Sequence, residues 1–291
     1  MKPNFFIIGA PKCGTTSMAN WLRSNPQVFM PEEKEPSFFN EDAQRAHYTT
    51  LEKYERLFLL VTKQHRAVGE ATSTYLESSV AVPRILDYQP KARFIVMLRT
   101  PLEMVVSLHA EELSILNEEI DSFEEAWAAQ QDRARGERIP TFCRAPSLLA
   151  YGPRCRLGGQ LQQLYKRVSS DRVHVAFLED FQSDPASAYR TVTGFLGIDA
   201  EPLPDFAPAN PRHKHRFRRL VRVMRAYEAA THRIGFHYQT GIMARIRGWN
   251  RGPAQRAELS DAMRTRLIDY YRADVRLLEE LTGRDLGHWL S

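Results

Sequence analysis

A segment near the N-terminus combines glycine, lysine and hydroxyl side chains at a spacing suited to binding an anion. It reads GAPKCGTTS from Gly9 to Ser17, follows an apolar run and precedes a helical pattern. Glycines at Gly9 and Gly14 allow a tight turn, and the backbone amides that begin the helix, from about Gly14 to Ser17, point toward a negative charge. A strand, a glycine-containing loop and a helix in this order predict a phosphate-binding site.

The same loop differs from the Walker A motif of nucleotide triphosphatases. It keeps the spacing of the two glycines, but Thr15 stands where those enzymes have their lysine, and the lysine of this chain is Lys12. A later apolar run ends in Arg99, where those enzymes have a metal-binding aspartate. A site with basic residues and no acidic magnesium ligand suits an anionic donor whose transferred group needs less charge neutralisation. We therefore expect that the reaction requires no metal ion. A P-loop kinase or nucleotide hydrolase is the alternative that these departures disfavour.

Short apolar runs separated by helical patterns must position this loop. The predicted buried strands are residues 4–9, 67–71, 93–98 and 172–178. Alternating strands and helices predict a mainly parallel sheet with helices on both faces, the doubly wound α/β class. A helix is predicted to begin after Thr100, because Pro101 follows it and Glu103 completes a capping box. Further helices are predicted at residues 158–168, 186–196 and 259–281.

The length of 291 residues fits either one large α/β domain or two smaller ones, and we expect a single domain over residues 1–291. We expect an α/β nucleotide-binding core at 1–184 and a helical portion at 185–291 that completes the cofactor and acceptor cleft. The chain is 43% hydrophobic and 26% charged, which is ordinary for a soluble globular protein and excludes collagen-like, disordered and disulfide-scaffold classes. No apolar run approaches the ~20 residues of a transmembrane helix.

The beginning of the chain and its cysteines predict a cytoplasmic location. The first apolar run leads directly into the glycine loop and shows no signal-peptide pattern. Cys13, Cys143 and Cys155 are an odd number of cysteines without metal-ligand spacing, which indicates a reducing compartment. A bridge between Cys143 and Cys155 is the disfavoured alternative.

Positive charge concentrates in residues 212–225, which read RHKHRFRRLVRVMR and contain no acidic residue. Such a run is usually a solvated helix face, and it also suits a polyanionic partner. A polyanion- or nucleic-acid-binding module is therefore another alternative. The intact phosphate loop argues against a purely binding role, so we expect no nucleic-acid partner.

Several segments resemble sulfotransferases that use 3′-phosphoadenosine-5′-phosphosulfate (PAPS). FIIGAPKCGTTSMANWL is similar to their 5′-phosphosulfate loop, RFIVMLRTPLEMVVSLH to their 3′-phosphate-binding strand and helix, and EKEPSFF to the K-E-x-x-F-F segment of the carbohydrate and heparan-type branch. Residues 165–198 and 270–290 also resemble that branch and its bacterial relatives. The resemblance implies a P-loop-like sulfotransferase fold and a sulfuryl transfer to an acceptor hydroxyl or amine.

This resemblance also implies which residues bind the donor. The loop residues at the 5′-phosphosulfate are Lys12, Cys13, Gly14, Thr15, Thr16 and Ser17. The 3′-phosphate would be held by Arg99 and Ser107 and by a C-terminal loop with Asn210, Arg212 and Lys214. Lys12 would stabilise the leaving phosphate during an in-line displacement. The product of the donor would be adenosine 3′,5′-bisphosphate (PAP).

The implied general base is Glu35, which would take the proton of the acceptor. His47 and His109 are rival bases, because another branch of the superfamily uses histidine. Where the carbohydrate branch commonly has E-K-[ST], this chain has Ala71 in place of the lysine. Either Lys12 carries more of the transition-state charge, or another cation, with Lys34 as the candidate, substitutes for that lysine.

Acceptor recognition is the least constrained part of the prediction. Glu70 and Thr72 are expected to shape the acceptor pocket together with Lys34. A glycan or natural-product hydroxyl is the favoured acceptor, and peptide tyrosine is an alternative. The sequence predicts neither the acceptor itself nor the oligomeric state, because acceptor choice depends on the shapes of loops.

Overall fold

The computed structural model describes residues 1–43, 48–143, 145–206, 213–215, 251–253 and 259–291. The chain divides into two compact units. The first contains Met1–Val105, Gly152–Asn210 and Asp261–Ser291, and the second contains Val106–Tyr151 and Pro211–Ser260. This division differs from the expected partition at residue 184, because C-terminal helices belong to the same unit as the sheet. That the chain is one domain stays a prediction.

The first unit is built on a five-stranded sheet in the order β2-β3-β1-β4-β5. Its strands are β1 (Phe5–Gly9), β2 (Val28–Phe29), β3 (Ala67–Ala71), β4 (Arg93–Leu98) and β5 (Val173–Phe177). All four strand pairs are parallel. Every residue of β1 is buried, as expected for a central strand covered on both faces. The predicted doubly wound α/β class is confirmed.

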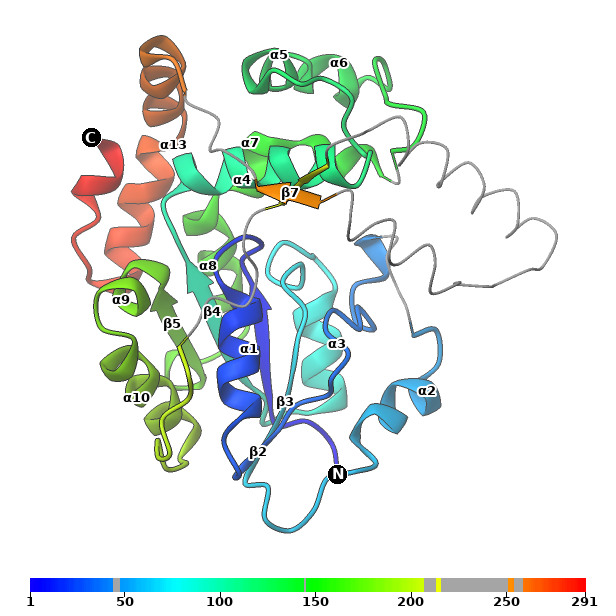
Figure 1. Ribbon diagram of the computed structural model, residues 1–291, viewed down its shortest axis with the longest axis vertical. Helices are drawn as coiled ribbons and strands as arrows, with labels where there is room; N and C mark the ends of the chain where they lie inside the picture. The colour runs from blue at the N-terminus through cyan, green and yellow to red at the C-terminus, as the bar shows by residue number, and fades with distance from the viewer. Residues whose placement is uncertain (44–47, 144, 207–212, 216–250, 254–258) are drawn as a thin grey trace, which may run out of the picture. The chain divides into compact units, whose positions relative to one another are not determined.

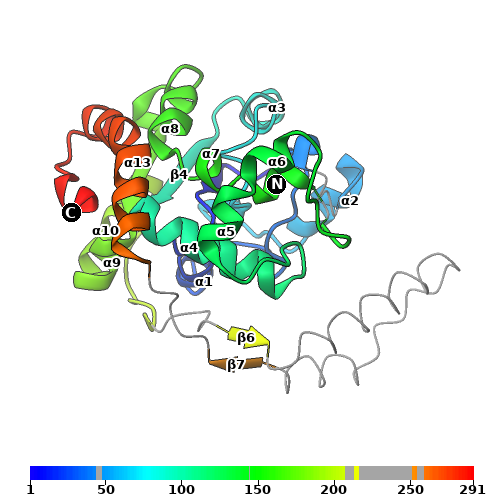
Figure 2. The same ribbon diagram turned by 90° about the horizontal axis from the view of Figure 1, so that it is seen from above.

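Helices cover both faces of this sheet (Figure 1). The helices of the first unit are α1 (Thr15–Arg23), α2 (Leu51–Glu55), α3 (Ala81–Tyr88), α8 (Leu157–Tyr165), α9 (Leu178–Ser183), α10 (Pro185–Leu196) and α13 (Asp261–Thr282). Figure 2 shows α3 and α8 on one face and α1 and α10 on the other. Short 3-10 turns of this unit are Glu41–Ala43, Arg56–Phe58, Ser170–Arg172 and Gly287–Leu290.

The C-terminal helix α13 packs directly on α8. A Cβ atom at Gly158 would lie 2.3 Å from the Asp274 carbonyl oxygen, so only glycine permits this approach. The Asp274 carboxylate accepts the amides of Gly158 and Gly159, each at 2.9 Å. It therefore satisfies donors at the start of α8 that the helix itself leaves unpaired.

The second unit contains helices α5 (Phe123–Ala128) and α6 (Gln130–Ala134), the 3-10 turn Pro146–Leu149 and the strands β6 (His213–His215) and β7 (Arg251–Pro253). β6 and β7 pair antiparallel. Helix α4 (Pro101–Ser114) begins in the first unit and continues into the second, and α7 (Tyr151–Arg154) begins at the end of the second.

A buried ion pair organises the second unit. Arg133 donates from Nη1 and Nη2 to the two carboxylate oxygens of Glu118, both at 2.7 Å, and the Tyr151 hydroxyl donates to Glu118 Oε2 at 2.9 Å. Burial alone would raise the pKa of Glu118, but the hydrogen bonds from Arg133 and from the Ile120 amide hold that pKa below its ordinary value. The paired charges thus stay ionised inside the unit.

The four predicted strands are confirmed to within a residue at each end, and helices α4, α8, α10 and α13 lie where helical patterns were predicted. The two-residue strand β2 escaped prediction because it is too short for a periodic pattern. Cys13, Cys143 and Cys155 are all free thiols. Within the described ranges, no helix is both long and apolar enough to span a bilayer.

Candidate active site

The loop between β1 and α1 has the shape of an anion cradle. Gly14 adopts a left-handed conformation, with φ of 87°, directly before the helix. In the described part of the chain, no side chain caps the start of α1 and its first turn contains no acidic residue. The helix therefore offers its N-terminal end to a negatively charged group.

Neighbouring residues leave no room for larger side chains in this loop. A Cβ atom at Gly9 would lie 2.7 Å from Leu76 Cβ and 2.9 Å from the Ser73 carbonyl oxygen. At Gly14 it would lie 2.8 Å from Leu178 Cδ1. Packing thus requires glycine at Gly9, whereas at Gly14 the end of the Leu178 side chain can move aside and the positive φ is what favours glycine.

The side chains of the loop divide into two groups. Cys13 and Thr15 are buried, whereas Lys12, Thr16 and Ser17 are half-buried. The Cys13 thiol donates to the Pro11 carbonyl at 3.4 Å, and burial raises its pKa to about 12. Cys13 is therefore a neutral packing group, and its contribution to an anion site is limited to its backbone.

Arg99 connects the end of β4 to the phosphate loop. Its Nη1 donates to the Lys12 carbonyl at 3.0 Å, and its Nη2 pairs with Glu103 Oε2 at 2.5 Å. Only 9% of the residue is exposed, and its buried Nε has no hydrogen-bond partner among the residues described. A buried guanidinium with an unused donor beside the loop fits an additional anionic ligand.

The Glu35 carboxylate lies beside this loop. Lys34 Nζ is 2.9 Å from Glu35 Oε1 and 3.2 Å from Thr15 Oγ1, so one ammonium group bridges Glu35 and the loop. Ser73 donates from its amide to Glu35 Oε2 at 2.9 Å and from its hydroxyl to Oε1 at 2.8 Å. The structure thus brings together Lys34, Glu35 and the loop. It adds Ser73, to which no sequence motif pointed.

Glu70 in β3 and Thr72 directly after it are buried, with 1% and 0% of their surfaces exposed. Burial raises the pKa of Glu70 to about 8, with a smaller contribution from the charge of Glu35. The nearby phenols of Tyr75 and Tyr54 oppose this rise. Neither Glu70 oxygen makes a well-formed hydrogen bond with a described group. Burial beside the phenols of Tyr54 and Tyr75 thus favours the protonated, neutral form of Glu70.

The remaining predicted site residues lie elsewhere. His109 is buried in the second unit, where its Nε2 lies 2.9 Å from the Ile120 carbonyl oxygen and its ring contacts Phe123 and Tyr151 edge-on. Ser107 lies on the α4 segment of the same unit. Lys214 lies in β6, and the residues outside the described ranges are His47, Asn210, Arg212 and most of the basic run 212–225. Their predicted roles stay predictions.

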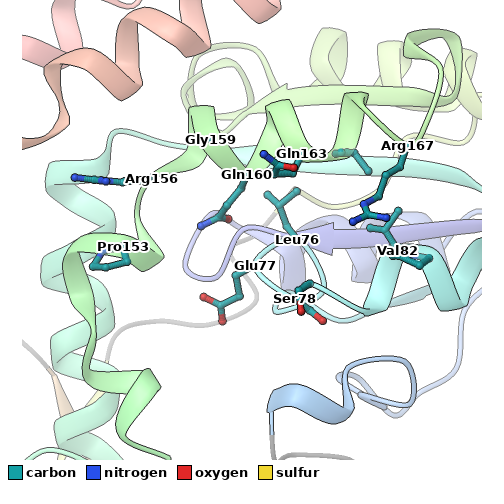
Figure 3. A pocket seen from close by; sticks show the side chains of 13 residues that line it. Leu76, Glu77, Ser78, Val82, Pro153, Arg156, Gly159, Gln160, Gln163 and Arg167 are labelled. Carbon is teal, nitrogen blue, oxygen red and sulfur yellow. The ribbon is translucent and has the colours of Figure 1, made fainter. Parts of the chain in front are cut away.

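A groove of about 440 Å³ opens between the loop after β3 and helix α8 (Figure 3). Leu76, Glu77 and Ser78 line one side, and Gln160 and Arg167 project toward them from α8 and the segment after it. Arg154 holds Glu77 through contacts at 3.0 and 3.2 Å. The sequence did not indicate this groove, because its walls come from segments about 80 residues apart.

The family of the chain is decided by a comparison with family models. A model described as "Sulfotransferase domain" matches residues 2–215. The chain belongs to the sulfotransferase family. The predicted family is therefore confirmed, and the phosphate loop, Glu35 and Arg99 all lie within the part of this sulfotransferase that the model matches.

Similar proteins include carbohydrate sulfotransferases. Human "Carbohydrate sulfotransferase 15" is 32% identical, with 36% of this chain and 26% of the relative covered. Mouse "Heparan sulfate glucosamine 3-O-sulfotransferase 3A1" is 28% identical, with 67% of this chain and 46% of the relative covered. "Membrane-associated sulfotransferase kil1" of Dictyostelium discoideum is 32% identical, with 36% and 22% covered. The sulfotransferase chain thus spans less than half of each of these curated relatives.

A solved sulfotransferase from Alicyclobacillus acidocaldarius matches the whole fold. Its TM-score is 0.74 at 25% sequence identity, and the match covers 100% of both chains. The five-stranded parallel sheet and its helices are thus an arrangement already known for a sulfotransferase.

Proposed function

We propose that this protein transfers the sulfuryl group of PAPS to an acceptor hydroxyl, with Glu35 as the general base. The observation that carries the proposal is the Lys34 bridge, which joins Glu35 to Thr15 of the phosphate loop. A base must lie close to the group that its substrate will attack. The bridge fixes the carboxylate beside the loop that would bind the phosphosulfate.

The residues of the first unit fit an adenosine donor with several negative charges. PAPS, when bound, would supply an activated sulfuryl group on a phosphosulfate. The uncapped amides of α1, together with Thr16 and Ser17, would hold the 5′ end of the donor. Arg99 would bind the 3′-phosphate, with the predicted help of Ser107, Arg212 and Lys214. Cationic Lys12 and Lys34 would stabilise negative charge during transfer.

Glu35 is arranged to accept a proton at Oε2. Its Oε1 already accepts hydrogen bonds from Lys34 and Ser73, whereas Oε2 accepts one, from the Ser73 amide, within the described structure. A carboxylate oxygen has room for a second donor. The acceptor hydroxyl would therefore give its proton to Oε2 as its oxygen attacks sulfur. Lys34 would supply the positive charge of the lysine that the carbohydrate branch has at the position of Ala71.

The acceptor that we favour is the hydroxyl of a glycan or of a related natural product. Support comes from the carbohydrate and heparan sulfate enzymes among the relatives. Because Glu70 and Thr72 are buried, we propose that they support the turn that carries Glu35. The kinase and hydrolase alternative is not favoured, since the matching family model is that of sulfotransferases.

The test combines ligand binding with product analysis. PAP and ATP are titrated separately against the protein by calorimetry. The protein and PAPS are then incubated with heparan sulfate, p-nitrophenyl glycosides or a tyrosine peptide, and the products are analysed by mass spectrometry. We expect tighter binding of PAP than of ATP and the mass of one sulfate added to a glycoside or glycan. Glu35→Gln should abolish at least 99% of turnover, roughly a hundredfold loss, with PAP affinity unchanged. Tighter ATP binding would contradict the proposal, and sulfation of the peptide alone would assign a tyrosine acceptor.

A further inference from the structure

Glu35 lies in a turn whose backbone conformation needs external support. Glu35 has φ of 59° and Ser37 has φ of 52°, and neither is glycine. Residues other than glycine are held in this left-handed region only when their surroundings fix them. The contacts that hold this turn therefore decide where the carboxylate points.

Three consecutive residues, the last of β3 and the two that follow it, supply those contacts. The Glu35 amide donates to the Ala71 carbonyl at 2.9 Å, and the Ser37 amide donates to Thr72 Oγ1 at 3.3 Å. Ser73 then binds the Glu35 side chain itself. The first two residues hold the backbone of the turn, and Ser73 is the one that holds the carboxylate.

The Ser73 contact is suited to orientation. Its amide and its hydroxyl reach different oxygens of one carboxylate, at 2.9 and 2.8 Å. Two hydrogen bonds from one residue fix the plane of the carboxylate, whereas the single bond from Lys34 leaves rotation about the last side-chain torsion free.

We infer that Ser73 is a positioning residue for sulfuryl transfer: it orients the Glu35 carboxylate so that Oε2 faces the acceptor. The inference rests on the proposed function, because it assigns Glu35 as the base. Ser73 itself has no contact with the reacting atoms in this mechanism. The Ser73 hydroxyl acts through Glu35. The backbone amide contact is kept in any variant in which residue 73 is not proline, so a substitution tests the hydroxyl alone.

The test compares Ser73→Ala, which loses the hydroxyl, with Ser73→Thr, which keeps both donors. Ser183→Ala is the matched control, because the Ser183 hydroxyl is exposed and donates to the Asp180 carbonyl of its own helix, at 3.1 Å. PAPS and the best acceptor from the panel of heparan sulfate and p-nitrophenyl glycosides serve as substrates. We expect kcat of Ser73→Ala to fall roughly ten- to a hundredfold, with KM for PAPS and PAP affinity unchanged. Ser73→Thr should retain most of the activity.

One further readout separates orientation from a purely structural role. A crystal structure of Ser73→Ala with PAP should show the Glu35 carboxylate rotated. Unchanged kcat, or a carboxylate in its original plane, would overturn the inference. Failure of the proposed function is recognised separately, as a wild-type protein that neither binds PAP nor sulfates any acceptor.

Discussion

Lys34 Nζ lies 3.2 Å from Thr15 Oγ1, although the two residues belong to different segments of the first unit. Thr15 is the first residue of α1, and Lys34 precedes the turn that carries Glu35. The same ammonium group also binds Glu35. A cation that contacts both segments can stabilise the charge of an anion bound at the loop and the charge of the Glu35 carboxylate at the same time.

Replacing Lys34 by methionine should lower kcat more than it weakens donor binding. The change removes a cation that stabilises charge in transfer, so we expect a decrease of roughly a hundredfold in kcat, as for loss of one preorganised donor. Lys34→Arg should restore part of the activity. Lys53→Met, at an exposed position of α2, is the control. Steady-state kinetics with PAPS measure the effect, and equal losses in kcat for both methionine variants would contradict a role specific to Lys34.

Replacing Arg99 by lysine should weaken PAP binding and lower stability together. Lysine cannot donate to the Lys12 carbonyl and to a phosphate with the fixed fork of arginine. We expect about a tenfold or greater increase in the dissociation constant of PAP, with a smaller change for ATP, which lacks a 3′-phosphate. Calorimetry of both ligands checks this. Arg190→Lys, at an exposed position paired with Glu201, should bind PAP like the wild type.

Glu70 should make the free energy of unfolding depend on pH. Its pKa is about 8 in the folded protein against an ordinary value of 4.5. Between those values the folded protein holds a proton that the unfolded chain has released, so stability falls as pH rises through this window and levels off above it. The slope for one such group is about 1 kcal/mol per pH unit.

Glu70→Gln should remove this dependence. Urea unfolding of wild type and variant at several pH values measures it, with the exposed Glu52→Gln as the control. We expect the variant to gain stability relative to the wild type as pH increases from 5 to 8. Parallel curves for the two proteins over this range would show that Glu70 is not protonated in the folded state.

Removing the buried partner of Glu118 should strongly destabilise the second unit. Arg133 and Glu118 have 2% and 0% of their side chains exposed. Arg133→Met leaves a buried carboxylate without its guanidinium, which costs about 3–5 kcal/mol. Arg138→Met, at an exposed ion pair, should cost about 1 kcal/mol or less. Calorimetric melting distinguishes the two, and similar melting temperatures would contradict the ionised pair.

Local sequence was sufficient to predict the elements that carry strong periodic or capping signals. The strands at Phe5–Gly9 and Arg93–Leu98 are continuous apolar runs, and the loop between Gly9 and Gly14 contains the glycines that its geometry requires. Family resemblance then directed attention to Lys34 and Glu35. These signals are local because hydrophobic burial and backbone freedom are properties of each residue in its immediate neighbourhood.

Contacts between distant segments could not be predicted in this way. Ser73 lies 38 residues from Glu35, and no pattern in either segment specifies that its amide and hydroxyl meet one carboxylate. The burial of Glu70 among Tyr54 and Tyr75, and the pairing of Glu118 with Arg133, are equally unmarked in the sequence.

The sequence by itself thus predicted four of the five strands of the sheet, helices α4, α8, α10 and α13, the loop proposed to bind the donor and, through family resemblance, Glu35 as the candidate base. Only the tertiary structure decided which groups surround that base, and that Glu70 and Thr72 are buried. The physical reason is that ionisation and orientation depend on desolvation and on donors a few ångströms away. Folding brings those donors together from segments that are far apart in the chain.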